Sequence, residues 1–261
     1  MTTTFVIGDL HGQLDRTHRL LRTAGLVNRQ LAWSGDNATL CFVGDYCDRG
    51  PHGLRCIELV MRLQQEAARA EGQVITLLGN HEVLLLAAHL FGDHRFDGIY
   101  YTFRELWQQN GGVQRDLDGL RPEHVAWLRT LPAVTQIGSR LLTHADALFY
   151  AELGQTPAAV NQVITELLKS EDPFVWQSLL ETFTERLAFF ENHREGASIA
   201  SAFLAAFGAA QLIHGHTPIP YMTGKPAAQV TEPFVYADGL CVNVDGGMYM
   251  GGPGFITRFA G

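Results

Sequence analysis

Six side chains in five short polar loops form a set that can bind two metal ions. Asp9 and His11 alternate, so an extended backbone directs both side chains to the same side. The Asp45 carboxylate has two oxygens and can bridge two ions, and the neutral ligands for a second ion are Asn80, His144 and His216. A hard carboxylate beside imidazole suits a first-row divalent metal better than calcium or a structural zinc. Two ions bridged in this way would hold the attacking and the leaving oxygens of a phosphoryl displacement.

Three further polar residues lie close to these ligands in the sequence and can carry catalytic steps. Arg49 follows Asp45 closely, and its planar guanidinium can bind two phosphate oxygens. His81 follows Asn80 and is well placed to protonate a leaving group, while Asp48 could orient His81 and raise its pKa. The sequence therefore predicts catalytic roles for these three residues, with Arg49 and His81 contacting the substrate phosphate. An Arg49 that merely pairs with Asp48 is the alternative.

Each polar loop follows a short apolar run that is typical of a buried strand. The runs cover residues 5–7, 40–43, 74–78, 141–143 and 211–213. Helical patterns follow the first three runs, at about 13–24, 51–71 and 80–91. In sheets built from such units, ligands bind beyond the carboxyl ends of the strands. We therefore expect all five polar loops to gather on one surface.

The later part of the chain is predicted to contain antiparallel hairpins and a helical region. Gly138-Ser139 indicates a turn between two strand patterns, and Asp238-Gly239 indicates a second such turn. The stretches at about 99–131 and 156–207 have mainly helical patterns. No repeat, linker or low-complexity tract divides the sequence. We therefore predict a single domain over 1–261, with the two helical stretches as an insertion or cap.

Composition argues against several classes of protein. Of 261 residues, 46% are hydrophobic and 18% are charged, which is typical of a globular chain. A net charge of −8 argues against a nucleic-acid surface but not against a phosphate substrate, since bound metal ions reverse the local sign. No apolar run approaches the length of a membrane span, and no targeting pattern begins the sequence. None of the four cysteines forms a CxxC pair, and the apolar runs around Cys41 and Cys241 favour buried inert thiols there. We therefore expect a cytoplasmic protein that binds neither membrane nor nucleic acid.

Three of the loops, in this order, resemble the signature motifs of the phosphoprotein phosphatase branch of the calcineurin-like metallophosphoesterases. They read Gly8-Asp9-x-His11-Gly12, Gly44-Asp45-x-x-Asp48-Arg49-Gly50 and Gly79-Asn80-His81-Glu82. Gly215-His216-Thr217-Pro218 is similar to the late histidine motif of bacterial members. Residues 20–27 and 244–248 look most like the Shewanella-like subgroup. The motifs span residues 8 to 247, so the resemblance covers nearly the whole chain.

The resemblance implies an α/β fold of four layers (α/β/β/α), the metallophosphoesterase fold. In it, a central β-sandwich of mixed sheets is flanked by helices and holds the metals at one edge. The resemblance also implies that a metal-bridging hydroxide attacks phosphorus directly, while His81 acts as the acid and Arg49 holds the phosphoryl oxygens. Family members commonly use manganese, iron or zinc. We therefore expect two divalent or trivalent ions, manganese or iron first, with zinc as a further option.

The sequence departs from the family pattern at three places. Many relatives have a second phosphate-holding arginine shortly after a tryptophan, whereas Trp176 has none at that offset. Arg186 and Arg194 are candidates to replace it. Asp146 stands where glycine is usual, and we interpret it as lying outside the metal ligands. His214 is an extra histidine, and both a role beside the ligands and plain packing stay open.

Two enzymatic functions and one other function fit these residues. The leading hypothesis is a phosphatase that hydrolyses phosphomonoesters of proteins, at phosphoserine, phosphothreonine or phosphotyrosine. The alternative substrate is a dinucleoside polyphosphate or another small phosphate ester, which the missing arginine keeps open. The third hypothesis is a regulatory module that binds metals with little turnover. A module of that kind would be expected to lose ligands or the acid, and the sequence retains all of them.

Overall fold

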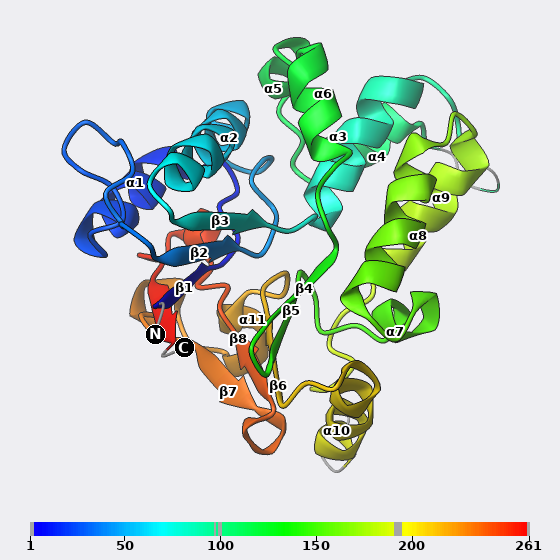
Figure 1. Cartoon of the computed structure of the whole chain (residues 1–261). Coiled ribbons are helices and arrows are strands. Elements are labelled where there is room, and N and C mark those ends of the chain that lie inside the picture. The colour runs from blue at the N-terminus through cyan, green and yellow to red at the C-terminus, as the bar shows by residue number, and fades with distance from the viewer. Residues whose placement is uncertain (1–2, 97, 99–100, 191–194, 260–261) are drawn as a thin grey trace.

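Two β-sheets form the centre of the structure, a computed structural model that describes residues 3–96, 98, 101–190 and 195–259 (Figure 1). The first sheet has four strands in the order β3-β2-β1-β9, and the second has five in the order β4-β5-β6-β8-β7. The strands of the first sheet are β1 (Thr4–Ile7), β2 (Thr39–Phe42), β3 (Gln73–Thr76) and β9 (Ile256–Phe259). Those of the second sheet are β4 (Val134–Ile137), β5 (Arg140–Thr143), β6 (Gln211–His214), β7 (Phe234–Tyr236) and β8 (Cys241–Asn243).

The first three strands are parallel and alternate with helices, as the sequence predicts. β1 pairs with β2 and β2 pairs with β3 in parallel, while β9 runs antiparallel to β1. The helices of this part are α1 (Leu14–Thr23), α2 (Gly53–Arg69) and α3 (Asn80–Phe91). Their bounds lie within a few residues of the predicted ones. Because the three strands share one direction, the first three polar loops lie at the same edge of the sheet.

The second sheet contains both predicted hairpins, but its strands are not all antiparallel. β4 pairs with β5 and β7 with β8 in antiparallel fashion, whereas β5, β6 and β8 are mutually parallel neighbours. Helical connections separate β5 from β6, and α11 (Ile219–Thr223) lies between β6 and β8. These connections return the chain to the same end of the sheet, which a pattern of local hairpins does not reveal. The loops after β5, β6 and β8 therefore share an edge.

Alternating side chains along the strands supply two cores. Val6 and Cys41 of the first sheet pack with Leu142 and Ile213 of the second in one apolar cluster. Their strand neighbours, including Phe42, belong instead to the larger cluster that contains the helices. Both faces of the inner strands β1, β2, β5, β6 and β8 are thus mostly buried, which is why these strands read as continuous apolar runs. This arrangement confirms the predicted α/β fold with two mixed sheets flanked by helices.

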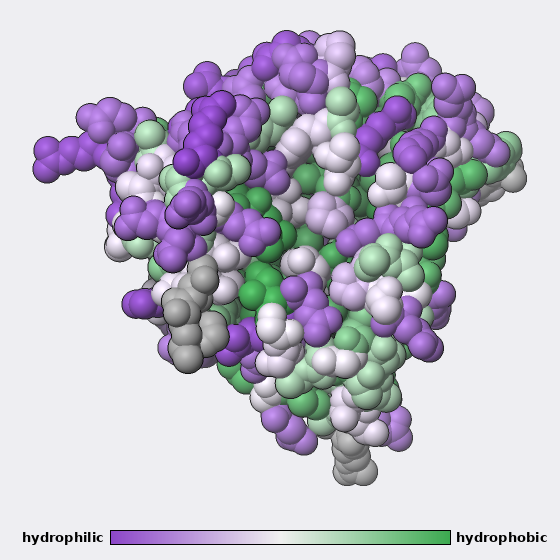
Figure 2. Space-filling model, in the orientation of Figure 1, coloured by the Kyte–Doolittle hydropathy of each residue, from purple (hydrophilic) through white to green (hydrophobic). Residues whose placement is uncertain are grey.

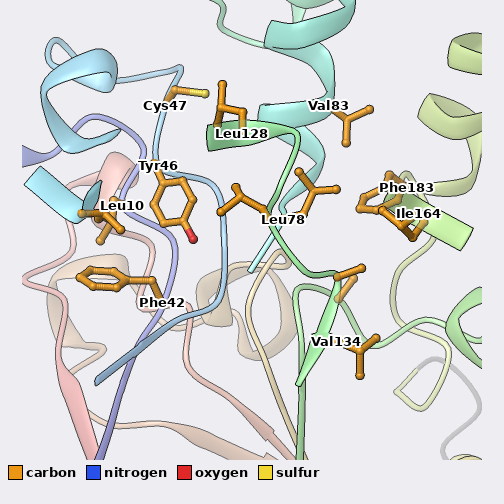
Figure 3. Packing of buried hydrophobic residues seen from close by; sticks show 14 of the residues in the cluster. Leu10, Phe42, Tyr46, Cys47, Leu78, Val83, Leu128, Val134, Ile164 and Phe183 are labelled. Atoms are coloured by element: carbon orange, nitrogen blue, oxygen red, sulfur yellow. The ribbon is translucent and has the colours of Figure 1, made fainter. Parts of the chain in front are cut away.

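A helical region lies between β3 and β6 in the sequence and beside the sandwich in space (Figure 1). Its helices are α4 (Phe103–Gln109), α5 (Gln114–Asp118), α6 (Pro122–Leu128), α7 (Phe149–Leu153), α8 (Pro157–Lys169), α9 (Pro173–Thr182) and α10 (Gly196–Phe207). α4 and α9 pack on α3, and α8 packs on β4. Figure 3 shows part of the shared core, from Leu10 and Phe42 to Ile164 and Phe183. The reading of this region as an insertion in one domain stays a prediction.

The four cysteines are buried and free, which confirms the prediction for Cys41 and Cys241. Among the described residues, no helix is both long and apolar enough to span a membrane. Arg194 lies outside the described residues.

Candidate metal centre

The six predicted metal ligands come together where the strands of both sheets end. Asp9 and His11 follow β1, Asp45 follows β2, and Asn80 begins α3 after β3. His144 follows β5 and His216 follows β6. Five of the six are buried, and the Asn80 side chain lies in contact with two of the others. The structure thus places the whole predicted set in one cluster.

Asp45 lies at the centre of this cluster. Its Oδ2 is 3.5 Å from His11 Nε2, and its Oδ1 is 3.3 Å from His144 Nε2. Two groups of potential ligand atoms, each within 4.8 Å of one another, therefore share Asp45: one with His11 and His81, and one with His144 and His216. Asp9 Oδ2 lies 3.9 Å from His11 Nε2 on the first side. The geometry places Asp45 where a carboxylate would bridge two ions.

Three polar atoms around the second group lie within hydrogen-bond distance of one another. His144 Nδ1 lies 2.8 Å from the carbonyl oxygen of Val43 and donates to it, so that Nε2 is an acceptor in the neutral imidazole. That Nε2 is 3.0 Å from Asn80 Oδ1 and 3.1 Å from His216 Nδ1. His216 Nδ1 is also 2.9 Å from Asn80 Oδ1. An N–H on His216 Nδ1 or on a protonated His144 Nε2 satisfies these contacts, and a metal ion bound here would displace that proton and take the lone pairs of all three atoms.

The same pattern of tautomer selection occurs on the first side. His11 Nδ1 lies 3.0 Å from the carbonyl oxygen of Cys47 and donates to it, so its Nε2 lone pair faces Asp45 and accepts an N–H of Arg49 at 3.0 Å. Asp9 accepts the backbone N–H of His216 through both oxygens at 3.1 Å, which joins the loop after β1 to the loop after β6. Backbone groups thus orient these ligands before any ion binds.

Electrostatics of the buried carboxylates call for positive charge. Burial and the charge of Asp245 raise the pKa of Asp9 well above its usual value. Burial alone would raise the pKa of Asp45, but the charges of His144 and His81 hold that pKa well below its usual value. Burial alone would lower the pKa of His144, but the charge of Asp45 raises that pKa to about 10. A proton on His144 therefore supplies positive charge beside these buried carboxylates. A metal ion that binds here would displace this proton and supply the charge instead. The residues therefore fit divalent cations.

Backbone strain is concentrated in the same loops. Eleven described residues other than glycine have positive φ, and five of them are predicted site residues: His11, Asp45, Asp48, Arg49 and His216. Such conformations cost about 1–3 kcal/mol each and persist where the surroundings enforce them. Two glycines allow the loops to approach closely. A Cβ on Gly79 would lie 2.2 Å from Asp45 Oδ1, and one on Gly215 would lie 2.2 Å from Asp9 Oδ1.

His81 and Asp48 form a buried pair beside the ligands. His81 Nδ1 lies 2.8 Å from Asp48 Oδ2, while His81 Nε2 is buried without a partner among the described residues. The other Asp48 oxygen accepts the indole N–H of Trp107 at 2.8 Å. The expected orientation of His81 by Asp48 is therefore present. The expected rise in pKa is not, because burial lowers the pKa of His81 to about 4.

Arg49 lies at the exposed rim of the cluster. Its guanidinium nitrogen is 3.0 Å from His11 Nε2, and its Cζ lies 4.4 Å from the centre of the Tyr249 ring. Its backbone N–H donates to the carbonyl of Gly111 at 2.7 Å. The alternative in which Arg49 merely pairs with Asp48 is not supported, because Asp48 is occupied by His81 and Trp107. The guanidinium is left facing the metal-ligand side.

Four residues near the site were not assigned to it from the sequence. Trp107 is fully buried, as the helical spacing of its neighbouring aromatic residues indicates, and its indole N–H also reaches Asp48, while the Tyr249 ring lies beside Arg49. Glu82 is fully buried and accepts the backbone N–H groups of Asp45, Tyr46 and Gly79 at 2.8–2.9 Å. Asp245, after β8, is buried with one oxygen unpartnered among described residues. Only the parallel pairing of β6 and β8 brings Asp245 here, and no local pattern indicates that pairing.

Asp146 and His214 belong to a separate buried network. Asp146 Oδ2 accepts the hydroxyl of Tyr236 at 2.7 Å, and that hydroxyl lies 2.8 Å from His214 Nε2. The other Asp146 oxygen accepts the backbone N–H of Leu187 at 2.9 Å. Asp146 therefore lies outside the ligand cluster, in line with the interpretation from the sequence.

An apolar cavity of about 220 Å³ opens beside Asn80. Three helices and the segment between α3 and α4 supply the apolar side chains of its wall: Leu84, Phe96, Leu106 and Leu180. Asn110, Glu181 and Thr184 complete it. Figure 2 shows apolar side chains recessed in the centre of one face, with polar ones around them. The cavity could hold the part of a substrate that lies next to a bound phosphate.

Comparison with known proteins gives matches over most of the sequence. A family model described as calcineurin-like phosphoesterase matches residues 2–220. Shewanella-like protein phosphatase 2 of Arabidopsis thaliana is 37% identical over 90 residues, which cover 34% of this chain and 22% of that protein. The symmetrical bis(5'-nucleosyl)-tetraphosphatase of Janthinobacterium sp. (strain Marseille) is 29% identical over 181 residues, which cover 69% of this chain and 55% of that protein. The matched regions thus span about a fifth and about half of these relatives.

A solved structure of a cold-active protein tyrosine phosphatase has the same fold. Its TM-score is 0.75 at 20% identity, and the match covers 99% of this chain and 73% of that chain. At this identity the likeness concerns the fold alone, and it confirms the predicted architecture. The relatives confirm the predicted resemblance to the phosphoprotein phosphatase branch and its Shewanella-like subgroup.

Proposed function

Because this chain belongs to the calcineurin-like phosphoesterase family, we propose that it is a dinuclear metal-dependent phosphatase acting on phosphomonoesters. The observation that carries the proposal is the arrangement of ligand atoms around Asp45, which belongs to both groups of the cluster. Next to those groups lie a buried histidine paired with a carboxylate and an arginine at the rim. This combination serves phosphoryl transfer to water.

In this proposal the metal ligands divide around Asp45. Asp9 and His11 would hold one ion, Asn80, His144 and His216 would hold the other, and Asp45 would serve both. When bound, the ions act as Lewis acids that lower the pKa of a water molecule and neutralise phosphoryl oxygens. Carboxylate and imidazole ligands favour manganese or iron, and zinc is compatible with them. His81 lies within the same distances but is already held by Asp48, so we assign it to proton transfer.

The remaining residues bind and protonate the substrate. The Arg49 guanidinium, steadied by the Tyr249 ring, binds the phosphoryl oxygens at the rim. The negative charge of the bound phosphoryl group then raises the pKa of His81, so that the imidazole gains a proton. His81 Nε2, which has no partner among the described residues, donates this proton to the leaving oxygen. Asp48 keeps the ring oriented through Nδ1, and Trp107 keeps Asp48 in place.

The favoured substrate is a phosphorylated protein side chain. Two observations support this choice: sequence relatives named as protein phosphatases, and an apolar cavity beside Asn80 that suits the body of a phosphoamino acid. The second candidate is a dinucleoside polyphosphate, which the similarity to a bis(5'-nucleosyl)-tetraphosphatase supports. Comparing kcat/KM on a phosphopeptide and on diadenosine tetraphosphate separates the two. A higher value on the tetraphosphate would replace the first candidate by the second.

The substitution His81→Ala tests the chemistry and the regulatory alternative together. A proton donor predicts a fall in kcat of about 100-fold or more with metal content unchanged. Equal turnover in both proteins would remove His81 from the mechanism. A wild-type protein that binds metal but hydrolyses neither p-nitrophenyl phosphate nor phosphopeptides would instead support the regulatory module.

A further inference from the structure

The turn between α4 and α5 lies against the loop that carries Asp48 and Arg49. The backbone N–H of Arg49 donates to the carbonyl of Gly111 in this turn at 2.7 Å. A second bond follows further along the loop, where the Arg115 guanidinium donates to the carbonyl of Pro51. These bonds hold two segments side by side that are distant in sequence. The turn therefore belongs to the surroundings of the site, although the proposed function assigns no role to it.

The first glycine of the turn lies directly against Arg49. Gly111 has a φ of 96°, a backbone conformation that glycine adopts without strain. A Cβ at this position would lie 2.7 Å from Arg49 Cγ and 3.3 Å from Arg49 Cα. The stem of the arginine thus rests on glycine backbone, and its guanidinium continues to the Tyr249 ring and to His11. A side chain at Gly111 would push the guanidinium away from that place.

The second glycine of the turn lies directly against Trp107. A Cβ on Gly112 would lie 2.2 Å from two ring atoms of the indole and 2.7 Å from its Nε1. That nitrogen donates to Asp48 Oδ1, and Asp48 Oδ2 lies 2.8 Å from His81 Nδ1. The indole is fully buried in close-packed surroundings, so it cannot move aside without moving its nitrogen. A glycine at position 112 is therefore a condition for the bond to Asp48.

The residue before the two glycines lines the apolar cavity. Asn110 shares the wall of this cavity with Asn80 and Leu106. Its Nδ2 donates to the carbonyl of Leu106 at 2.9 Å, which holds the amide at the end of α4. Three consecutive residues thus contact the cavity, the arginine and the indole. A shift of the turn would change all three contacts together.

Asp116 fastens the other end of the turn to the start of α2. It is buried on α5, and the backbone N–H groups of Leu54 and Gly53, in the first turn of α2, stabilise its charge. α2 has no acidic residue in its own first turn, and its N-cap residue His52 makes no side-chain cap bond. A carboxylate from α5 thus serves the positive end of α2. One segment of the helical region consequently holds the loop between Asp48 and α2 at both ends.

We propose that Gly111 and Gly112 are positioning residues for two different steps of the reaction. Gly111 sets the guanidinium of Arg49 for phosphate binding, and Gly112 sets the Trp107 indole that holds the partner of His81. The inference rests on the proposed function, because it concerns residues assigned there to phosphate binding and proton transfer. Neighbouring glycines then have separable effects, one on affinity for phosphate and one on turnover. A turn with a merely structural role would not divide its effects in this way.

The first test measures binding of inorganic phosphate to manganese-loaded protein, by calorimetry and by competitive inhibition of p-nitrophenyl phosphate hydrolysis. Gly111→Ala should weaken phosphate binding and raise KM by about 10-fold with little change in kcat, because the displaced guanidinium loses charge-assisted bonds. In the Arg49→Ala background, which lacks Cγ, Gly111→Ala should weaken phosphate binding little further.

The matched control for Gly111 is Gly239→Ala, in the turn between β7 and β8. Gly239 has a similar φ of 86°, and a Cβ there would meet no described part of the chain within 4 Å apart from its sequence neighbours. The control therefore carries a similar backbone strain without the contact to Arg49. We expect it to lower the melting temperature and to leave phosphate affinity and KM unchanged.

The second test measures kcat in Gly112→Ala. Displacement of the indole should lower kcat by about 10- to 100-fold, while phosphate affinity stays within about twofold of wild type. The indole N–H resonance of Trp107, assigned by its loss in Trp107→Phe, should shift because its bond to the carboxylate lengthens. Adding Gly112→Ala to Trp107→Phe should lower kcat little further, since the donor is already absent.

The matched control for Gly112 is Gly35→Ala. A Cβ on Gly35 would lie 2.8 Å from a ring atom of Trp33, in the loop before β2 and thus at the opposite end of that strand from the metal ligands. This control crowds a tryptophan ring that makes no bond to the site. It should lower the melting temperature without lowering kcat.

Because an alanine in the turn can prevent folding, Arg115→Ala provides an exposed alternative. It removes the bond to the carbonyl of Pro51, and the loosened turn should weaken phosphate binding and raise KM by about 3-fold. Arg19→Ala removes an exposed arginine on α1 and should leave both values unchanged. Equal values in the two arginine variants would count against the positioning role.

The outcomes separate this inference from the proposed function. If wild-type protein hydrolyses p-nitrophenyl phosphate and each glycine variant matches its control, the inference fails while the proposed function stands. Agreement of one pair alone would overturn the role of that glycine. If wild-type protein binds phosphate without turnover, the proposed function fails, and the phosphate affinities and the indole resonance still decide the inference. Absence of phosphate binding to metal-loaded wild-type protein would overturn the proposed function together with the role of Gly111.

Discussion

Replacing Trp107 by phenylalanine tests whether the indole N–H supports catalysis through Asp48. The substitution keeps an aromatic ring in the core and removes the donor that lies 2.8 Å from Asp48 Oδ1. Trp107 and Asp48 are both fully buried, so water cannot replace the lost bond easily. A hydrogen bond to a charged group contributes about 1.5–3 kcal/mol. Because about 1.4 kcal/mol corresponds to a factor of ten, misplacing Asp48 and His81 should lower kcat/KM by about 10- to 100-fold.

The protein provides a matched control at Trp176. That tryptophan is also fully buried, and its indole N–H donates to the backbone carbonyl of Ser170 at 2.9 Å, away from the ligand cluster. We expect Trp107→Phe and Trp176→Phe each to lower the free energy of unfolding by about 2–4 kcal/mol in urea titrations. Only Trp107→Phe should lower kcat on p-nitrophenyl phosphate, measured well below both melting temperatures. Equal kcat in the two variants would reduce Trp107 to a packing residue and refute the reasoning.

Three further predictions concern other parts of the protein. Tyr249→Leu removes the ring that lies against Arg49 and should raise KM about 3- to 10-fold with little change in kcat. Tyr249→Phe keeps the ring and should behave as wild type. Equal KM values for the two variants would contradict the stacking role. Glu82→Gln replaces one acceptor oxygen of a side chain that accepts three backbone N–H groups. It should lower the free energy of unfolding by about 3 kcal/mol and reduce the metal content. Unchanged metal content would contradict this prediction. Burial alone would raise the pKa of Glu66, but hydrogen bonds from the Trp33 N–H and Arg62 lower it. The ionised carboxylate therefore stabilises the fold at pH values above its ordinary pKa near 4.5, and this stabilisation is lost as the pH falls below that value. Glu66→Gln should therefore lower the free energy of unfolding by about 0.5–1 kcal/mol at pH 7 and by less at pH 3, since solvent screens this partly exposed group. A loss that grows toward low pH would refute the assignment.

The strand-end loops were predictable because their signal is local. Each ligand follows a short apolar run directly, and parallel strands place such loops at one edge whatever the rest of the fold does. The sequence indicated Asp45 as a bridge because its carboxylate has two oxygens, but Asp9 has two as well, and only the distances to His11 and His144 distinguish Asp45. The helix bounds followed from apolar periodicity and from breaks at glycine, as at Gly79 before α3.

The residues that support the site were harder to predict, because their positions depend on long-range contacts. Trp107 reaches Asp48 across 59 positions of sequence, and its helical spacing indicates only burial. Asp245 enters the site through the parallel pairing of β8 with β6, which a hairpin pattern at Asp238-Gly239 does not disclose. The pKa of His81 was predicted in the wrong direction, because a sequence shows the partner Asp48 but not the burial that lowers the pKa.

The central claim is that Asp45 and the five residues around it hold two metal ions that hydrolysis requires. The most direct measurement removes metal with a chelator, reloads the protein with manganese, and determines metal content and hydrolysis of p-nitrophenyl phosphate on the same samples. The account predicts about two ions per chain, turnover that returns only with metal, and loss of both in Asp45→Asn, since one side chain contacts both groups of ligands. A correctly folded protein that binds no metal, or that hydrolyses the ester equally well after chelation, would contradict it.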